Sequence, residues 1–253
     1  MDGRDSKPGD RNEGAAKNRS SDLFLDDAAN ASSELSEDQA LALLKRSAVS
    51  AADLAALGRN PSAMRSRKVL LALATHPRTP RHVTIPLLRQ LFTFDLMQVA
   101  LTPVVAADVK RAAEEQILNR LESVSLGEKI SLARRASGRV AAGLLLDAEA
   151  RVISTALDNA RLVEPSVVTA LMKHNAPPAL FVLVSAHPKW SLRKEVQIAL
   201  LRNEKTPLPC AVELAHNFSV ELLREIVPES RRETLLQSAQ KSETDDFESG
   251  EVK

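Results

Sequence analysis

The sequence predicts an all-α protein, a right-handed α-solenoid of about four three-helix repeats of roughly 42 residues, preceded by a helical half-repeat. Three observations predict this fold class. Apolar residues recur three and four positions apart in short segments. Turns that contain proline separate these segments, and similar residues return at a nearly constant spacing. No alternation of apolar and polar residues typical of β-strands recurs along the chain.

The repeat length comes from pairs of similar turns. Thr79-Pro80 and Thr206-Pro207 follow closely matching segments, and three repeats of this length separate them. Pro103 and Pro188 are separated by about two repeats. The units are therefore expected at 61–102, 103–145, 146–187 and 188–229, after a half-unit at 35–60.

Each unit divides into three expected helices. The first helices are expected at 67–75, 108–121, 148–157 and 192–201. The second helices are expected at 84–91, 126–136, 166–173 and 208–216. The third helices are expected at 94–101, 138–145, 178–186 and 219–227. None of these short helices can bury its apolar face alone, so each unit is expected to stack on its neighbours.

Serines mark the start of several expected helices. Ser125 is followed three residues later by Glu128, the spacing of a capping box in which each side chain satisfies a free backbone N–H group. Two further pairs predict short helices in the half-unit, Ser36 with Gln39 and Ser50 with Asp53.

The two ends of the chain differ from the middle. Residues 1–34 and 230–253 are poor in large apolar residues, and we expect a disordered tail at the N-terminus and a helix end with an acidic tail at the C-terminus. The longest apolar run of the first segment is Leu23-Phe24-Leu25, which is either a docking motif or a chance triplet. No signal-peptide pattern is present, and apolar runs of seven residues or fewer are far below the roughly 20 that cross a membrane. We therefore expect a cytoplasmic protein that does not enter the membrane and is monomeric.

The chain carries 34 basic and 33 acidic residues, so its net charge of +1 does not by itself attract nucleic acid. Residues 61–229, however, hold 22 basic and 16 acidic side chains. The densest basic cluster consists of Lys129, Arg134, Arg135 and Arg139. Because arginine binds carboxylates and phosphates with two parallel hydrogen bonds, this cluster suits an acidic partner or a nucleic-acid backbone. The alternative is a solvated helix face.

A second candidate contact lies at Lys189, Trp190, Arg193 and Lys194. A lone tryptophan among cations is typical of an interface anchor, but Trp190 also suits a buried plug between the third and fourth units. Arg151 is a further candidate contact, and the sequence leaves open whether it lines one concave side of the array with Arg134, Arg139 and Arg193.

No residue pattern indicates catalysis. The five histidines are scattered over the expected units, and the single cysteine, Cys210, cannot form a disulfide or an iron-sulfur site by itself. With 3% aromatic residues and no tyrosine, the chain has little to stack on nucleobases or line a ligand pocket. We therefore expect a protein that is not an enzyme and holds no metal or cofactor.

Three stretches carry a resemblance to known repeat proteins: LATHPRTPRHV, DNARLVEPSVVTAL and HPKWSLRKEVQIALLRNEKTP. They resemble the HEAT and armadillo class and, more narrowly, the bacterial leucine-rich repeat variant solenoids. The resemblance implies a bacterial scaffold that binds another protein along its repeats. Alternatives are binding of a nucleic-acid backbone, as in HEAT-like glycosylases, or an accessory enzyme resembling HEAT-like lyases. One protein of the variant type carries a cysteine cluster for iron and sulfur, and this chain lacks those cysteines.

Overall fold

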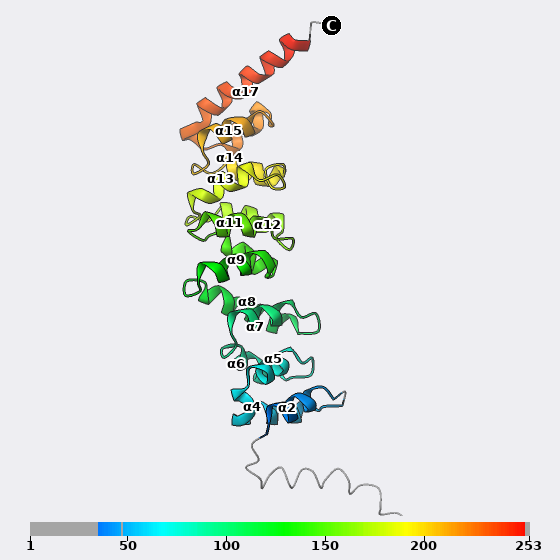
Figure 1. Cartoon of the computed structure of the whole chain (residues 1–253). Helices are drawn as coiled ribbons and strands as arrows, with labels where there is room; N and C mark the ends of the chain where they lie inside the picture. Colours follow the sequence, from blue (N-terminus) through cyan, green and yellow to red (C-terminus); the bar gives the residue numbers. More distant parts are fainter. Residues whose placement is uncertain (1–34, 47, 251–253) are drawn as a thin grey trace, which may run out of the picture.

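The protein is all-helical over the part of the chain that the computed structural model describes, residues 35–46 and 48–250. Sixteen helices and no strand occur there, which confirms the all-α prediction. The helices follow one another in chain order along a column that runs from α2 to α17 (Figure 1). No helix in this range combines the length and the apolar composition that crossing a bilayer requires.

Most helices are short, and their positions agree closely with the expected ones. In the first half of the chain they are α2 (Glu37–Leu44), α3 (Ala51–Leu57), α4 (Pro61–Arg65), α5 (Arg67–Thr75), α6 (Arg81–Leu88), α7 (Thr93–Leu101), α8 (Ala107–Arg120) and α9 (Leu126–Arg135). In the second half they are α10 (Gly138–Leu144), α11 (Ala150–Leu157), α12 (Glu164–Leu171), α13 (Pro178–Ala186), α14 (Lys194–Leu201), α15 (Leu208–Ala215), α16 (Val220–Ile226) and α17 (Glu229–Gly250).

The predicted helix starts are confirmed by hydrogen bonds. All three capping boxes form, at Ser36, Ser50 and Ser125. At Ser125 the hydroxyl accepts from the backbone N–H of Glu128, whose carboxylate accepts in return from the backbone N–H of Ser125. The four first N–H groups of a helix have no partner inside it, so these side chains fix where each helix begins.

The turn at 76–80 recurs at 203–207 with the same hydrogen bonds. Asn203 Oδ1 accepts from the backbone N–H of Lys205 at 3.0 Å, and His76 Nδ1 accepts from that of Arg78 at 3.2 Å. The threonine that follows, Thr206 or Thr79, donates its hydroxyl to a carbonyl six residues earlier. These side chains bind the backbone in a tight turn, which explains why similar residues return at these positions.

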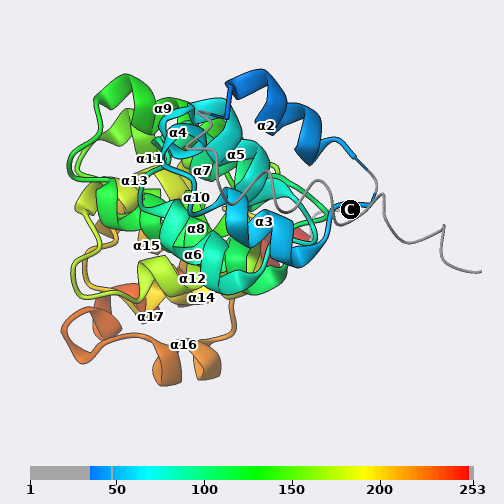
Figure 2. The same cartoon turned by 90° about the horizontal axis from the view of Figure 1, so that it is seen from below.

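The helices pack in two layers along the column. Besides contacts with helices next to them in the chain, α5 contacts α7, α9 contacts α11 and α11 contacts α13 in one layer, and α6 contacts α8, α8 contacts α10, α10 contacts α12 and α12 contacts α14 in the other. Viewed along the column, helices of successive pairs lie over one another (Figure 2). The boundaries at 61–102, 103–145, 146–187 and 188–229 remain a prediction.

The period seen in the sequence and the observed pairing have a common origin. The helices α5, α7, α9, α11, α13 and α15 begin at 67, 93, 126, 150, 178 and 208, so one helix with its turn takes on average a third of the sequence period. The turn at 76–80 joins α5 to α6, whereas the turn at 203–207 joins α14 to α15. Because the same turn follows both α5 and α14, its recurrence gives the spacing of helices along the chain and does not indicate which helices pack together.

Basic side chains tie each pair to the one before it. Arg120 Nη1 donates to the carbonyl of Leu91 at 2.6 Å, and Lys205 Nζ donates to that of His174 at 2.6 Å. Similar bonds to carbonyls of the preceding pair are made by Arg78 to Val49, Arg161 to Arg135, and Arg231 to Glu204 and Thr206. Carbonyls at helix ends lack intrahelical partners and carry partial negative charge, so a cation there is stabilising.

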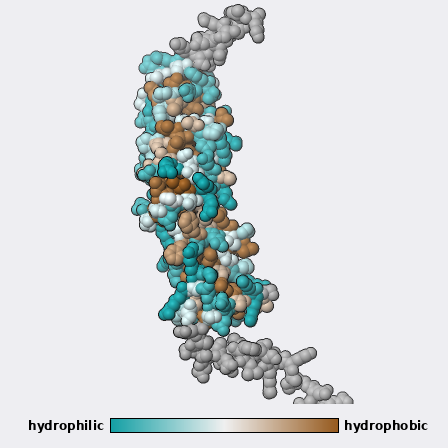
Figure 3. Space-filling model, viewed as in Figure 1, coloured by the Kyte–Doolittle hydropathy of each residue, from teal (hydrophilic) through white to brown (hydrophobic). Residues whose placement is uncertain are grey.

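One continuous apolar core runs the length of the column, from Ala40 to Ala239. Its largest fully buried side chains are Trp190 and Phe181. On the face seen in Figure 3, the remaining hydrophobic patches are separated by hydrophilic side chains.

Two tail expectations have different outcomes. The segment 230–253 is mostly helical, because α17 extends to Gly250, which corrects the expectation of a tail there. Residues 1–34, with the triplet Leu23-Phe24-Leu25, and residues 251–253 lie outside the described residues.

Candidate binding groove

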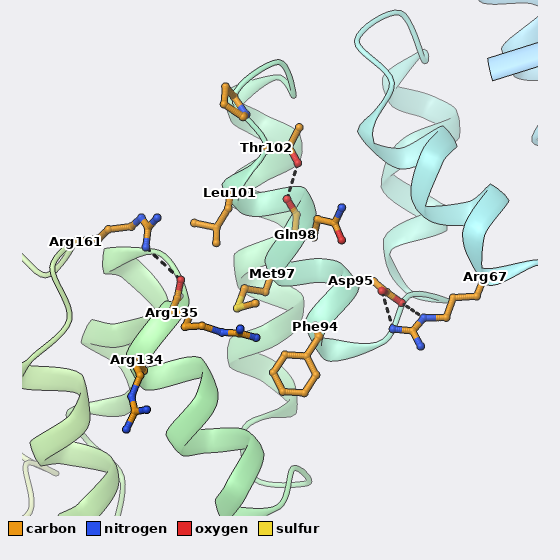
Figure 4. Close-up of a pocket in the computed structure, with 11 residues that line it drawn as sticks. Arg67, Phe94, Asp95, Met97, Gln98, Leu101, Thr102, Arg134, Arg135 and Arg161 are labelled. Atoms are coloured by element: carbon orange, nitrogen blue, oxygen red, sulfur yellow. Dashed lines mark hydrogen bonds and ion pairs between the residues drawn. The ribbon is translucent and has the colours of Figure 1, made fainter. Parts of the chain in front are cut away.

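A groove of about 720 Å³ opens between α7 and α9. One side consists of Phe94, Met97, Gln98 and Leu101 of α7, continued by Thr102 and Pro103. The other side consists of Arg134 and Arg135 at the end of α9, with Arg161 from the loop after α11. Arg67 and Asp95 close one end. We call these eleven residues the α7–α9 groove (Figure 4).

The groove lies where the regular packing of one layer is interrupted. Helices α5 and α7 pack on each other, as do α9 and α11, but α7 and α9 make at most marginal contact. Helix α8, which joins them, has 14 residues, whereas the other helices of α5–α16 have 7 to 10. Because a helix lengthens with every residue added, α8 and its following turn carry the chain further before α9 begins. No hydrogen bond joins the loop 102–106 to the loop 136–137, both of which are described, and the space between them stays open.

Three arginines give the groove a positive side. Arg134, Arg135 and Arg161 are all exposed, and none forms an ion pair with a carboxylate among the described residues. Arg161 is oriented by its own hydrogen bond to the carbonyl of Arg135, at 3.3 Å. Figure 4 shows the side chain of Arg135 extending toward α7. Exposed guanidinium groups without partners are available to bind an incoming carboxylate or phosphate with two hydrogen bonds.

The acidic residue of the groove is already neutralised. Asp95 Oδ2 and Oδ1 accept from Arg67 Nε and Nη2 at 2.7 and 2.8 Å, and the carboxylate is only 6% exposed. The hydrogen bonds with Asp95 raise the pKa of Arg67 most, and the negative charge of Asp95 raises it further. The guanidinium of Arg67 also lies 4.9 Å from the centre of the Phe92 ring. Asp95 therefore does not cancel the charge of the three other arginines.

The side opposite Arg134 and Arg135 carries three apolar side chains beside the polar Gln98 and Thr102. Phe94, Met97 and Leu101 follow one another along α7 (Figure 4), and Phe94 and Leu101 are partly exposed. Apolar side chains beside exposed guanidinium groups suit a ligand that carries both negative charge and at least one apolar group.

A second pocket, of about 400 Å³, adjoins the α7–α9 groove. Glu37, Lys68 and Leu71 line it together with Arg67 and Asp95, which both pockets share. Glu37 Oε1 lies 2.9 Å from Lys68 Nζ, and Glu37 Oε2 accepts from the Ser66 hydroxyl at 2.7 Å. These contacts lower the pKa of Glu37, the Lys68 hydrogen bond most. The start of α2 therefore lies beside the end of the groove where Arg67 and Asp95 are located.

The predicted basic cluster does not stay together. Lys129 Nζ pairs with Asp147 Oδ2 at 2.7 Å and is only 19% exposed. Helix α9 ends at Arg135 and a new helix, α10, begins at Gly138 and contains Arg139. Arg135 and Arg139 therefore do not share one helical face. Arg139 Nη1 lies 3.7 Å from Glu114 Oε2, and Arg139 lines a different pocket, of about 420 Å³, with Lys173. Only Arg134 and Arg135 of the four line the groove.

The residues of the second predicted contact, at 189–194, also lie in different surroundings. Trp190 is 1% exposed and donates its indole N–H to the carbonyl of Leu157, which confirms the buried plug, so the alternative of an exposed anchor is wrong. Lys189 Nζ lies 4.0 Å above the Trp190 ring. Arg193 and Lys194 are exposed at the start of α14, and Arg151 is exposed on α11. These three cations line neither the groove nor the pocket at Arg139.

Sequence reasoning missed the partners of Arg134 and Arg135. Phe94, Met97 and Leu101 have the spacing of core residues, and Arg161 stands in a repeated turn, so neither pattern marks a binding site. Arg161 does share its turn position with Arg78 and Lys205, which was the available signal.

No three His, Cys, Asp or Glu side chains gather as a metal ion requires in the part of the chain described above. The chain matches no protein-family model, no curated protein sequence and no solved structure.

Proposed function

We propose that this protein is an α-solenoid without catalytic activity whose α7–α9 groove binds an extended acidic segment of another protein. The single observation that carries the proposal is that Arg134, Arg135 and Arg161, which form no ion pair among the described residues, line the same groove as the apolar side chains of α7. The stacked helix pairs and the recurring turns support the solenoid, because each pair contacts mainly its neighbours.

A peptide is favoured over a nucleic acid by the composition of the groove. Duplex backbones are bound by basic stripes that follow many phosphates. In this groove only Arg134, Arg135 and Arg161 lack an ion pair among the described residues, whereas Arg67 is already paired with Asp95. The apolar side chains of Phe94 and Leu101 would form no favourable contact with a phosphate backbone. A peptide with acidic residues on either side of an apolar one satisfies both sides of the groove.

The test is a fluorescence anisotropy titration of the full chain with a labelled peptide of sequence Asp-Asp-Leu-Phe-Asp-Asp. We expect Arg134→Glu with Arg135→Glu to weaken binding at least tenfold, which is about 1.4 kcal/mol. The matched control is Arg193→Glu with Lys194→Glu, which makes the same charge change at exposed positions outside the groove. A peptide with serine in place of leucine and phenylalanine is expected to bind more weakly.

Two outcomes contradict the proposal. Equal weakening by both double variants shows attraction to the overall charge and no groove. Tighter binding of a 20-base-pair DNA duplex at about 50 mM salt, lost in the groove variant, assigns the arginines to nucleic acid instead.

A further inference from the structure

We infer that residues 20–27 of this chain, Ser-Ser-Asp-Leu-Phe-Leu-Asp-Asp, are an intramolecular ligand of the α7–α9 groove, so that a partner must displace them to bind. The inference rests on the proposed function, because it assigns an occupant from this chain to the same groove.

The chemistry of the segment complements both sides of the groove. Leu23, Phe24 and Leu25 are consecutive large apolar residues, with Asp22 before them and Asp26-Asp27 after them. No longer apolar run occurs in residues 1–34. An apolar centre with carboxylates at both ends suits Phe94 and Met97 on one side and the guanidinium groups of Arg134 and Arg135 on the other.

The described chain begins next to the groove. Ser36 caps α2, and Glu37 in the first turn of α2 lines the adjoining pocket with Arg67 and Asp95. Arg67 and Asp95 also close the end of the groove. The described chain therefore begins beside a pocket that shares Arg67 and Asp95 with the proposed site.

The connecting segment is long enough. Eleven residue steps separate Phe24 from Leu35, and at about 3.3 Å each they span up to roughly 36 Å. From α2 the path crosses α5 to reach α7, two steps of about 10 Å between packed helices. It then follows part of α7, whose nine residues rise about 14 Å.

A tether of this length makes weak binding sufficient. A short flexible linker gives an effective concentration in the millimolar range. A segment with an intrinsic dissociation constant of about 100 μM would then occupy the groove about nine tenths of the time, and a competing peptide would bind about tenfold more weakly.

The experiment compares full-length chains in the same anisotropy assay, with a labelled peptide of residues 20–28 as the probe. The test variant carries Leu23→Ser, Phe24→Ser and Leu25→Ser. The matched control carries Ala28→Ser, Ala29→Ser and Ala31→Ser, three changes to serine in the same part of the chain. We expect the test variant to bind the peptide about tenfold more tightly than the wild type, and the control to bind it as the wild type does.

Three results overturn the inference in distinguishable ways. Equal affinity of wild type and test variant, with loss in Arg134→Glu with Arg135→Glu, removes the intramolecular ligand and keeps the groove. Absence of binding in every chain, or binding that the arginine variant leaves unchanged, removes the proposed function as well. Tighter binding in the control variant also shows an effect unrelated to the apolar triplet.

A second measurement separates this chain from a second copy. p-Benzoylphenylalanine in place of Phe24 is expected to crosslink to the peptide that contains Met97 within one chain. In a mixture of ¹⁵N-labelled and unlabelled protein, crosslinks of mixed mass would assign the groove to a neighbouring copy and overturn the intramolecular inference.

Discussion

The indole N–H of Trp190 donates to the backbone carbonyl of Leu157, 33 residues earlier, at 2.8 Å. Both residues are buried, with Leu157 at the end of α11 and Trp190 in the loop after α13. The lone tryptophan of the chain thus closes the C-terminal end of a helix in the preceding pair and fills the space between the two.

Trp190→Phe is therefore expected to lower the free energy of unfolding by about 2 to 4 kcal/mol, because it leaves the Leu157 carbonyl buried without this donor and leaves a cavity. Denaturant unfolding followed by circular dichroism measures the change. Leu192→Ala, in the same loop but 78% exposed, is the control and should change stability by less than about 0.5 kcal/mol. A loss for the phenylalanine variant no larger than that of the control would contradict the role of Trp190 as a plug.

Gly138 allows the loop that carries Arg161 to approach α10. A Cβ atom at this position would lie 2.2 Å from the carbonyl oxygen of Arg161, a backbone atom that cannot move without shifting the loop. Gly138→Ala is therefore expected to lower stability by about 1 to 3 kcal/mol and to weaken peptide binding, since Arg161 lines the groove. Thermal unfolding and the anisotropy assay measure the two effects.

Gly127→Ala is the matched control for that prediction. A Cβ there meets nothing within 4 Å, and the residue lies in the first turn of α9. Alanine is favoured over glycine in helices by up to about 1 kcal/mol, so this variant should be as stable as the wild type or more so. Equal behaviour of the two alanine variants would show that the close approach at Gly138 has no energetic consequence.

The lowered pKa of His76 predicts that the stability of the protein depends on pH. Burial, and then the charge of Arg78, lower the pKa of His76 below its usual 6.5, and the Nδ1 atom accepts the backbone N–H of Arg78. The unfolded chain therefore takes up a proton at a higher pH than the folded one. The stabilising contribution is complete above about pH 7 and is lost as the pH falls through 6.5 toward the folded pKa.

His76→Asn removes the titration and keeps the turn, because Asn203 makes the same hydrogen bond at 3.0 Å in the equivalent turn. The melting temperature of the wild type is expected to fall more steeply between pH 7.5 and 5 than that of the variant. Differential scanning fluorimetry across this range measures both, and parallel curves would show that His76 does not contribute.

Much of the fold was predictable because its signals are local. Capping at Ser36, Ser50 and Ser125 depends on residues three positions apart, and the turns after His76 and Asn203 depend on residues two to six apart. Helix positions were therefore close to those observed. The turns do not by themselves fix the packing unit, because a turn motif indicates that a helix ends and not which helix lies beside it.

The groove was predictable only in part for the same reason. Arg134 and Arg135 stand out in the sequence as adjacent cations, but Lys129 and Arg139 stood out equally. Whether each cation is free depends on Asp147 and Glu114, which belong to other segments of the chain. The approach of such segments is set by how helices stack.

The sequence by itself determined that this chain is helical, where most of its helices lie, and that its middle section is rich in arginine and lysine. The tertiary structure decided that Trp190 is buried, that Lys129 pairs with Asp147, and that Arg134, Arg135 and Arg161 line one groove with Phe94 and Met97. The physical reason is that helix formation and capping are short-range along the chain, whereas burial, ion pairing and the opening of a groove arise only between helices that the stacking brings together.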